Sequence, residues 1–342
     1  MRSSRKLAAV LAVAALLAPL ASIGQDGGTL GAVQDRGRLV CGVNSGVPGF
    51  GFLDEETGTF SGFDIDYCKA LAVAIFNDPN AVEYRPLTAA ARFTALATGE
   101  IDVLIRNTTW TFTRDVDLTT NFAPTTYYDG QGFMVRVDSG VNTIDDLDGA
   151  TICVLQGTTT EQNLADEFAK RGLDYTPLVF AETAARDQAY DEGRCDAITS
   201  DASQLAAIRT KLSNPDEHKI LTELISKEPL GPVVRHGDDR WFDIVKWTVF
   251  CTVEAEELGV HSGNVDQQLQ SDDPRVRRLL GVEGDFGEKL GLSNDWCANI
   301  IRTVGNYGEI YARNLSPIGL PREGSLNALW QDGGLLYSPP FR

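Results

Sequence analysis

The sequence predicts an α/β protein of two similar lobes joined by a hinge, with a helical carboxyl-terminal extension. Its 342 residues are enough for two domains. Short β-type runs alternate with helical runs, a pattern typical of parallel sheets covered by helices. The end of the first alternating unit, residues 99–104 (GEIDVL), also corresponds to the end of the second, residues 193–198 (GRCDAI). Chance is the alternative, because a glycine closes many helices.

The first unit is predicted to be a βαβαβ unit between residues 38 and 105. Its helix beginning near Asp64 has that aspartate as its N-cap and ends before Pro79. Gly99 closes the next helix. The expected order is strand 38–43, helix 64–78, strand 82–85, helix 89–98 and strand 101–105.

The second unit repeats this order, with Gly172 and Gly193 closing its helices. Its expected elements are strand 151–155, helix 161–170, strand 175–180, helix 182–191 and strand 197–200. Extended segments at 127–135 and 229–235 would cross between the lobes twice and allow a hinge. The predicted domains are a signal peptide (1–24), the first part of lobe 1 (25–130), lobe 2 (131–232) and the second part of lobe 1 with the extension (233–342).

The extension is predicted to be helical at first and irregular at its end. We expect a helix at 243–257, and another that Ser293 caps. The second carries an aromatic and aliphatic stripe, interpreted as core rather than as a binding surface: Trp296, Ile300, Val304, Tyr307 and Tyr311. The tail, 316–342, is rich in Pro and Gly and is expected to wrap lobe 1.

The amino terminus has the features of a secretory signal peptide. A basic start precedes an apolar run at 7–17 and small residues at Ser22 and Gly24, with cleavage expected after Gly24. An uncleaved anchor is the alternative, but the run is shorter than the roughly 20 residues of a membrane span. We therefore expect a periplasmic protein. Its formal charge of -18 argues against a nucleic-acid partner.

Six cysteines lie in the predicted mature chain, where export favours disulfides over free buried thiols. Six cysteines permit 15 pairings. None forms a C-x-x-C motif, and the chain has only three histidines, so no zinc-site spacing is present. Bridges inside one lobe would leave the hinge free, which predicts the pairs Cys41 with Cys68, Cys153 with Cys195 and Cys251 with Cys297.

Catalytic and cofactor motifs are absent from the sequence. It has no H-E-x-x-H, no G-x-S-x-G, no P-loop and no dinucleotide-binding glycine motif. We expect no cofactor, no metal and no catalytic residue.

Polar residues instead follow the predicted strands, where open α/β sheets place their ligands. Residues 106–115 (RNTTWTFTRD) offer hydroxyls, an amide and guanidinium groups suited to a carboxylate. Residues 155–161 place three threonines at a helix N-terminus, and Asp201 could receive an ammonium group. The alternatives are helix caps at Thr158 and Asp201, and a surface ion pair of Arg114 with Asp115 or Asp117.

These motifs together resemble the periplasmic solute-binding proteins of polar amino-acid ABC importers, and most of all the general L-amino-acid branch. The resemblance covers nearly the whole mature chain. It rests on 61–66 (SGFDID), 99–104, 106–111 (RNTTWT), Arg114, 155–159 (LQGTT), 196–201 (DAITSD) and 304–311 (VGNYGEIY). It implies the two-lobed, type II periplasmic binding protein fold, an L-amino acid ligand, and permease subunits of an ABC transporter as partners.

The resemblance also implies roles for individual residues. Arg114 matches the arginine that binds the ligand α-carboxylate, and Asp201 matches the acid that holds the α-ammonium. The hydroxyls of Thr109 and Thr159 match groups that assist the carboxylate, and Asn107 matches an ammonium contact. The remaining candidates are Thr158, Asn44, Trp110 and Arg106.

The sequence departs from the family where relatives specific for cationic amino acids have an acid and an aromatic, because it has Asn44 and Val47 there. Phe50, Phe52 or Trp110 could replace the aromatic lid. The loop 44–52 contains no charge, which predicts broad specificity, whereas Arg106 turned inward would favour glutamate or aspartate.

The predicted function is therefore that of a monomeric exported protein that closes on free L-amino acids and delivers them to a permease. The main alternative is a dehydratase on the same scaffold, with Asp129 or Glu161 as its acid. A receptor's sensory domain is a third possibility, but no transmembrane or kinase region follows the lobes.

Overall fold

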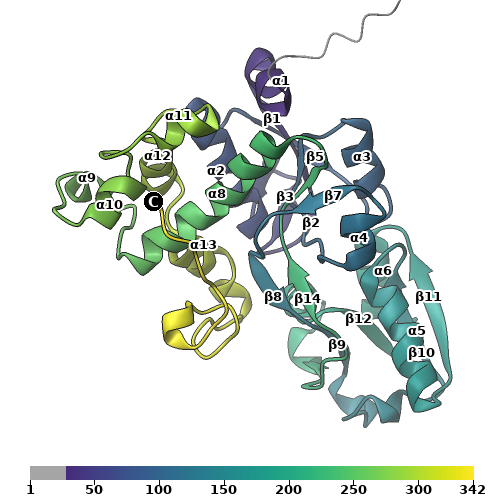
Figure 1. The fold of residues 1–342 in the computed structure, drawn as a ribbon. Helices are drawn as coiled ribbons and strands as arrows, with labels where there is room; N and C mark the ends of the chain where they lie inside the picture. The colour runs from purple at the N-terminus through teal and green to yellow at the C-terminus, as the bar shows by residue number, and fades with distance from the viewer. Residues whose placement is uncertain (1–27) are drawn as a thin grey trace, which may run out of the picture.

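The computed structural model describes residues 28–342, and the predicted signal peptide lies outside these residues. Two α/β lobes lie one above the other, and a helical region extends from the side of the first lobe (Figure 1). The first helix, α1 (Gly28–Arg36), was not expected from the sequence. The predicted two-lobed α/β fold with a helical extension is confirmed.

Lobe 1 contains a five-stranded sheet with the strand order β5-β1-β6-β15-β7. Strand β1 pairs in parallel with β5 and β6, because helices connect these strands. The strands are β1 (Leu39–Val43), β5 (Val82–Pro86), β6 (Val103–Leu104), β7 (Thr120–Phe122) and β15 (Val233–Arg235). The lobe's helices are α2 (Phe63–Phe76), α3 (Arg92–Thr98) and α4 (Phe112–Val116), and a small sheet joins β2 (Gly46–Val47), β3 (Gly51–Asp54) and β4 (Thr59–Ser61).

Lobe 2 has an equivalent sheet with the order β11-β10-β12-β9-β13. Its strands are β9 (Gln131–Arg136), β10 (Ala150–Leu155), β11 (Tyr175–Phe180), β12 (Ala197–Asp201) and β13 (His218–Ile220). Its helices are α5 (Thr159–Arg171), α6 (Thr183–Asp191) and α7 (Ala202–Arg209). In each βαβαβ unit the first strand (β1 or β10) lies between the second (β5 or β11) and the third (β6 or β12), so the two units share one topology.

The sequence repeat between the two lobes corresponds to a structural repeat. Gly99 and Gly193 both adopt a left-handed backbone, with φ values of 77° and 76°. The carboxylates three residues later also have the same role: Asp102 accepts a hydrogen bond from Val40 N at 2.7 Å, and Asp196 accepts one from Thr151 N at 2.7 Å. Each carboxylate thus bonds the backbone of the strand that begins its βαβαβ unit, β1 or β10. This shared role argues against a chance match.

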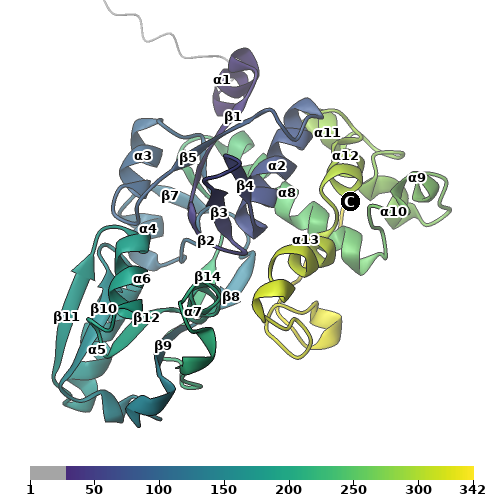
Figure 2. The same cartoon turned by 180° about the vertical axis from the view of Figure 1, so that it is seen from behind.

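Two short strands connect the lobes. Strand β8 (Tyr127–Asp129) pairs antiparallel with β14 (Glu228–Leu230). In both views the pair lies between the two large sheets (Figures 1 and 2). A narrow connection of two paired strands is the architecture that lets two lobes move about a hinge.

The helical region differs from the prediction in two respects. Asp295, not Ser293, is the N-cap residue of the helix that follows. Residues 293–311 form two helices rather than one, α12 (Trp296–Thr303) and α13 (Tyr307–Asn314). The helical conformation is interrupted at Gly305, which has a φ of 103°. Asn306 then caps the second helix in a capping box. The remaining helices are α8 (Asp239–Glu257), α9 (Val265–Gln268), α10 (Pro274–Leu279) and α11 (Phe286–Leu290).

The core and tail of lobe 1 follow the expectations. The aromatic residues Trp296, Tyr307 and Tyr311 are buried in one cluster with the helices and first strand of the lobe, as predicted. The tail packs back on lobe 1, where Arg322 pairs with Glu256 and the Asn327 side chain bonds the Tyr128 backbone. One local prediction is wrong: Gly62, not Asp64, is the N-cap of α2. Asp64 lies inside the helix and is buried.

The three disulfides are those expected: Cys41–Cys68, Cys153–Cys195 and Cys251–Cys297. The first and third lie in lobe 1 and the second in lobe 2, so none of them restrains the hinge.

Removing a disulfide should destabilise its own lobe. The residues of the Cys251–Cys297 bridge are 46 positions apart, for which loop-closure entropy predicts about 4 kcal/mol. We expect the Cys251→Ala/Cys297→Ala protein to lose about that much free energy of unfolding in urea. A loss below about 1 kcal/mol would contradict the loop-closure account.

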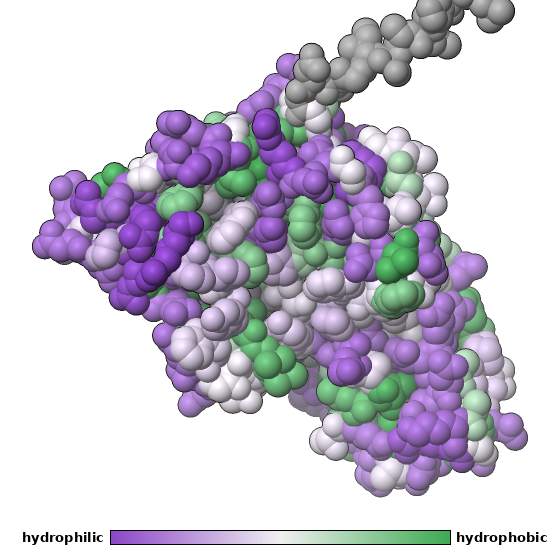
Figure 3. Space-filling view, in the orientation of Figure 1, coloured by the Kyte–Doolittle hydropathy of each residue, from purple (hydrophilic) through white to green (hydrophobic). Residues whose placement is uncertain are grey.

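The surface seen in Figure 3 is mainly hydrophilic, with apolar side chains in separate small groups. Between residues 28 and 342, no helix is both long and apolar enough to cross a bilayer.

Candidate functional site

A small cavity lies between the lobes, at the carboxyl ends of strands from both sheets. It collects most of the predicted site residues. Its lining comprises Ala89, Arg92, Arg106, Asn107, Thr109, Leu155, Thr158, Thr159, Thr160, Ser200, Asp201 and Gln204. The loops after β6, β10 and β12 supply most of these residues, as the topology of open α/β sheets predicts. We call this space the inner cavity.

The loop after β6 turns sharply into the inner cavity. Asn107 has a positive φ of 30°, a conformation that asparagine tolerates better than most residues. Its N–H donates to Asp64 Oδ2 at 2.8 Å, and its Oδ1 accepts from Asn44 Nδ2 at 3.3 Å. Burial raises the pKa of Asp64 to about 7, against the lowering effects of the Asn107 N–H and of Arg106. The hydrogen bond from Asn107 N to the buried Asp64 carboxylate therefore holds this loop against α2.

Arg106 is a buried member of the same loop. Its Nε donates to the Leu87 carbonyl at 2.8 Å. Burial lowers its pKa to about 10, and Asp64 is the carboxylate that most opposes this effect. Two lobe 1 residues, Leu87 through a hydrogen bond and Asp64 through its charge, therefore already stabilise this guanidinium.

Arg114 lies beside the inner cavity rather than among its lining residues. It belongs to α4, where it is 8% exposed, and its Nη1 donates to the Thr109 carbonyl at 2.9 Å. Burial lowers its pKa, while Glu228 and Asp201 are the nearest opposing charges. Within residues 28–342 it forms no ion pair, so the alternative of a pair with Asp115 or Asp117 does not hold.

Lobe 2 contributes hydroxyls from the start of α5. Thr158 caps this helix, since its hydroxyl accepts from Glu161 N at 3.1 Å and donates to the Leu155 carbonyl at 2.7 Å. The alternative reading of Thr158 as a cap is therefore correct, although the residue also lines the inner cavity. Thr159 projects toward lobe 1, where its hydroxyl lies 3.4 Å from that of Thr109.

Asp201 ends β12 and is 4% exposed. It stands at the N-cap position of α7 but makes no capping bond with its side chain. Instead, Gln204 Nε2 donates to its Oδ2 at 2.6 Å. Burial, with Asp129 and Glu228 nearby, raises its pKa well above the ordinary value. This carboxylate is thus poorly compensated, which suits it to receive a cation.

Two functional candidates were missed by the sequence analysis. Arg92, at the start of α3, is 3% exposed and lines the inner cavity. Glu228, on the crossing strand β14, is 1% exposed and joins the lobes. Neither lies in a polar motif after a strand, and neither belongs to the motifs that carry the family resemblance.

Glu228 holds the two lobes together by hydrogen bonds. Its Oε2 accepts from the Thr109 hydroxyl of lobe 1 at 2.6 Å and from the Thr159 hydroxyl of lobe 2 at 2.8 Å. Its Oε1 accepts from Asn163 at 2.8 Å and from Ser226 at 2.5 Å. The two hydroxyls that the resemblance assigns to a ligand carboxylate thus contact a carboxylate of the protein.

A larger outer cleft lies next to the inner cavity. Arg106 lines both spaces. The inner cavity contains about 20 Å³ of free space, room for about one water molecule. The outer cleft contains about 830 Å³, with Asn44, Phe52, Glu182 and Lys211 among its lining. Lys211 of lobe 2 donates to the Gly46 carbonyl of lobe 1 at 2.7 Å. In this closed arrangement an amino acid enters the inner cavity only if the lobes or the lining side chains move apart.

The proposed aromatic lid is not at the inner cavity. Trp110 is 42% exposed and stacks on Phe122, with its Nε1 donating to Asp115 at 3.1 Å. Phe50 is buried against Phe63, and Val47 is also buried. Of the three candidate aromatics, only Phe52 lines the outer cleft.

The two carboxylates considered for dehydratase chemistry are both engaged. Glu161 accepts a hydrogen bond from Gly157 N at 2.8 Å, as part of the α5 N-terminus. Asp129 bonds the Ser203 hydroxyl and Gly130 N. Burial raises the pKa of Asp129 to about 6. Neither residue lines the inner cavity.

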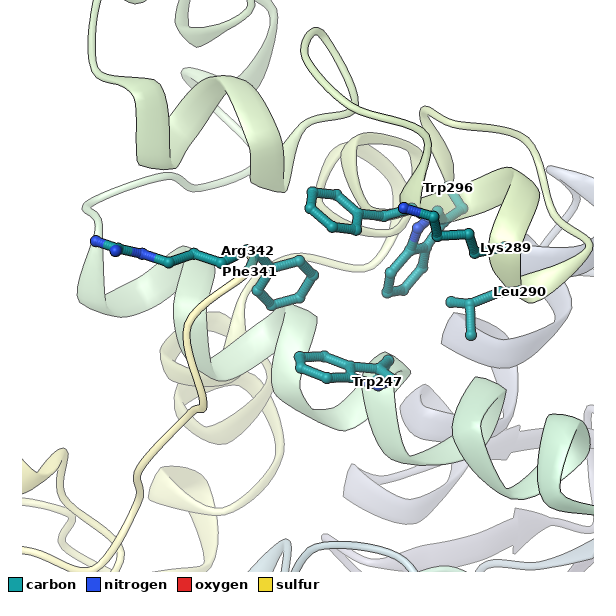
Figure 4. Close-up of a pocket in the computed structure, with 7 residues that line it drawn as sticks. Trp247, Lys289, Leu290, Trp296, Phe341 and Arg342 are labelled. Atoms are coloured by element: carbon teal, nitrogen blue, oxygen red, sulfur yellow. The ribbon is translucent and has the colours of Figure 1, made fainter.

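A separate apolar pocket lies in the helical extension (Figure 4). The residues that line it are Trp247, Phe286, Lys289, Leu290, Trp296, Phe341 and Arg342. None of these lining residues is an aspartate or a glutamate, so no acidic side chain is present to receive the ammonium group of a zwitterion. The polar inner cavity is the better candidate for an amino acid.

Comparisons with known proteins show which family the chain is similar to. Residues 39–260 match the family of bacterial extracellular solute-binding proteins, family 3. The chain is 53% identical over 340 residues to the general L-amino acid-binding periplasmic protein of Rhizobium johnstonii, covering 98% of this chain and 97% of that protein. It is 51% identical over 336 residues to the glutamate/glutamine/aspartate/asparagine-binding protein of Rhodobacter capsulatus, covering 97% of each.

The fold is also similar to a solved structure along most of its length. A periplasmic binding protein from Brucella ovis with glutathione bound is 51% identical, with a TM-score of 0.89. The match covers 92% of this chain and 99% of that one. The likeness thus includes both lobes and the helical extension.

Proposed function

The chain belongs to family 3 of the bacterial extracellular solute-binding proteins, and on that premise we propose that it captures L-amino acids in the periplasm for an ABC transporter. Closure of the lobes would bring one ligand between them, and the closed protein would present it to the permease subunits of the transporter. The protein would act as a monomer without a cofactor.

One observation carries the proposal: the buried guanidinium of Arg114 on lobe 1 lies within range of the charge of a buried, poorly compensated carboxylate on lobe 2, Asp201. Arg114 is proposed to bind the α-carboxylate and Asp201 the α-ammonium. Against the larger lowering effect of burial, Asp201 is close enough to Arg114 for its charge to raise the pKa of the arginine. A zwitterion is the ligand that satisfies both charges at once, which accounts for selection of amino acids as a class.

The hydroxyls of Thr109 and Thr159 support the same assignment. Both now donate to Glu228, a carboxylate at the lobe crossing. We infer that a ligand carboxylate competes with Glu228 for these hydroxyls as the lobes close. Asn107 and Thr158 would complete the polar surroundings, and Asn44 would meet the ligand at the border of the outer cleft.

A non-enzymatic role is favoured over dehydratase chemistry. The chain is similar over nearly its full length to proteins named for amino-acid binding. The two carboxylates that could act as acids lie outside the inner cavity. Incubation with prephenate and arogenate tests this directly: product formation above the uncatalysed rate would overturn the binding role.

Glutathione is a second candidate ligand, favoured by the outer cleft. This space lies next to the inner cavity and is within the usual size range of small-molecule sites. The similar Brucella ovis protein holds glutathione. The γ-glutamyl end of glutathione carries the α-amino acid groups that the inner cavity would bind, and the remaining residues would extend into the outer cleft.

Calorimetric titration of the purified protein with the twenty L-amino acids and with glutathione tests the proposed function. We expect several amino acids to bind within a range narrower than about a thousandfold. Competition with glutamate would show whether glutathione occupies the same site. A protein that binds none of these ligands would contradict the proposal.

Amino-acid affinity should fall at low pH. Burial raises the pKa of Asp201, and a bound ammonium would favour its ionised form, so binding releases a proton. Affinity should therefore increase with pH until Asp201 is ionised in the free protein, and then level off. Titrations between about pH 5 and about pH 8 in buffers of different ionisation enthalpy measure this proton release. Affinity that is independent of pH over this range would contradict the role of Asp201.

A further inference from the structure

We propose that Arg92 selects ligands with a second carboxylate, so that glutamate and aspartate bind more tightly than glutamine and asparagine. The inference rests on the proposed function, because it assigns the side-chain end of the same ligand. Within the broad specificity proposed above, it gives an order of affinity among the amino acids that bind.

Arg92 is a buried cation without a direct partner. It is the first residue of α3 and is 3% exposed. Among the described residues, its Nε has no hydrogen-bond partner, and its guanidinium forms no ion pair. Arg92 lines the inner cavity together with Asp201, so a cation with an unsatisfied Nε donor borders the space where a ligand would lie.

The surroundings make this charge costly in the ligand-free protein. Burial, with Arg114 and Arg106 nearby, lowers the pKa of Arg92 well below its ordinary value, and only Asp201 and Glu228 oppose this effect. An unpaired buried charge carries a large desolvation penalty. A ligand that supplies an anion here therefore gains more than one that supplies a neutral group.

None of the nearby carboxylates is available to Arg92. Glu228 already accepts hydrogen bonds from Thr109, Thr159, Asn163 and Ser226. Asp64 is bonded to Asn107 N and offsets the charge of Arg106. Asp201 is bonded to Gln204 and is assigned to the ligand ammonium. Arg92 therefore has no carboxylate bonded to it directly, although the three nearby carboxylates equal the three arginines of the site in number.

A dicarboxylic amino acid supplies a carboxylate that can bond Arg92 directly. Its α-carboxylate and ammonium would satisfy Arg114 and Asp201, leaving one carboxylate for Arg92. Both guanidiniums lie beside the Phe93 ring, since the guanidinium carbons of Arg92 and Arg114 are 5.2 and 5.3 Å from its centroid. Two cations placed beside one ring suit the two carboxylates of one small ligand.

Arg106 is a poorer candidate for this role, although the sequence suggested it. Its Nε is bonded to the Leu87 carbonyl, and Asp64 already offsets its charge. Arg92 Nε has no such hydrogen bond, and the carboxylates that oppose its pKa shift, Asp201 and Glu228, are bonded to other groups. The structure therefore moves the expected preference for acidic ligands from Arg106 to Arg92.

Calorimetric titration of the wild type and of Arg92→Gln with glutamate and glutamine tests the inference. In the wild type we expect glutamate to bind at least about tenfold more tightly than glutamine. In the variant, glutamate affinity should fall at least about 30-fold, whereas glutamine affinity should change less than about threefold. Arg85→Gln is the matched control, because Arg85 is an exposed lobe 1 arginine outside both cavities, and both affinities should stay unchanged.

Each other outcome overturns the inference in a distinguishable way. Equal losses for glutamate and glutamine in Arg92→Gln would make Arg92 a contact common to all ligands or a structural residue. Unchanged affinities, or a wild type without preference, would remove it from the site while leaving the proposed function in place. A wild type that binds no amino acid would overturn the proposed function as well.

A second variant and a second measurement guard against misfolding. Arg92→Met keeps the length of the side chain without its charge and should show the same selective loss. The thermal unfolding midpoint provides the independent readout. Glutamate should raise the midpoint of the wild type more than glutamine at equal concentration, and the two ligands should raise it equally in either variant. A difference that persists in both variants would contradict the inference.

Discussion

Substitution of Arg114 by alanine should abolish measurable amino-acid binding in a protein that remains folded. The guanidinium is buried, bonds only the Thr109 carbonyl directly, and forms no ion pair among residues 28–342. Truncating one partner of a buried, hydrogen-bonded charge pair costs about 2 to 5 kcal/mol, which is about 30-fold to about 4,000-fold in affinity. Isothermal titration with glutamate and glutamine measures this loss.

The ligand itself provides the sharper test of Arg114. The compound 4-aminobutanoate is glutamate without its α-carboxylate. It should bind the wild type weakly, and the difference between glutamate and 4-aminobutanoate should largely disappear in Arg114→Ala. Arg302→Ala is the matched control, because Arg302 pairs with Asp266 in the helical extension, away from the lobes. Retained affinity in a folded Arg114→Ala protein, shown by an unchanged circular dichroism spectrum, would refute the assignment.

Local sequence patterns were sufficient to predict the fold. The alternation of strands and helices, with a glycine closing a helix and an aspartate after it, predicted both lobes. The structure explains why this signal is reliable: Asp102 and Asp196 each bond the backbone of a neighbouring strand, so the motif belongs to the sheet itself. The disulfides could also be predicted, because each bridge lies within one lobe.

Predictions failed where a tertiary contact determines a local feature. Asp64 has the usual identity of an N-cap, but burial beneath the loop after β6 makes it an anchor for Asn107 instead. The apolar stripe of 293–311 continues through Gly305, although the backbone breaks there and Asn306 starts a new helix. Periodicity detects the buried face of both helices but does not detect the break between them.

The site was predictable only where it follows the ends of strands. Asn107, Thr109, Thr159 and Asp201 lie in such loops, and the structure brings them to one cavity or its border. Arg92 occupies the start of a helix, and Glu228 occupies a crossing strand whose partner lies about a hundred residues earlier in the chain. Their roles depend on the packing of one lobe against the other, which leaves no pattern in the nearby sequence.

Asp201→Asn should produce a loss of amino-acid affinity comparable to that of Arg114→Ala, through the ammonium group. Asparagine keeps the shape of the side chain and can still bond Gln204, but it cannot offset a buried ammonium charge. The expected loss is again about 2 to 5 kcal/mol. The proton release measured in buffers of different ionisation enthalpy should disappear as well, since burial raises the pKa of the aspartate that asparagine replaces.

Glutarate, which is glutamate without its ammonium group, separates this effect from general damage to the site. Removing the ammonium from the ligand should weaken binding strongly in the wild type and only slightly in Asp201→Asn, because the two changes remove the same interaction. The substitution also removes a carboxylate that lies close to Asp129 and Glu228, so the variant should be at least as stable as the wild type without ligand. A variant that loses glutamate and glutarate affinity to the same extent would show that Asp201 supports the cavity and does not bind the ammonium.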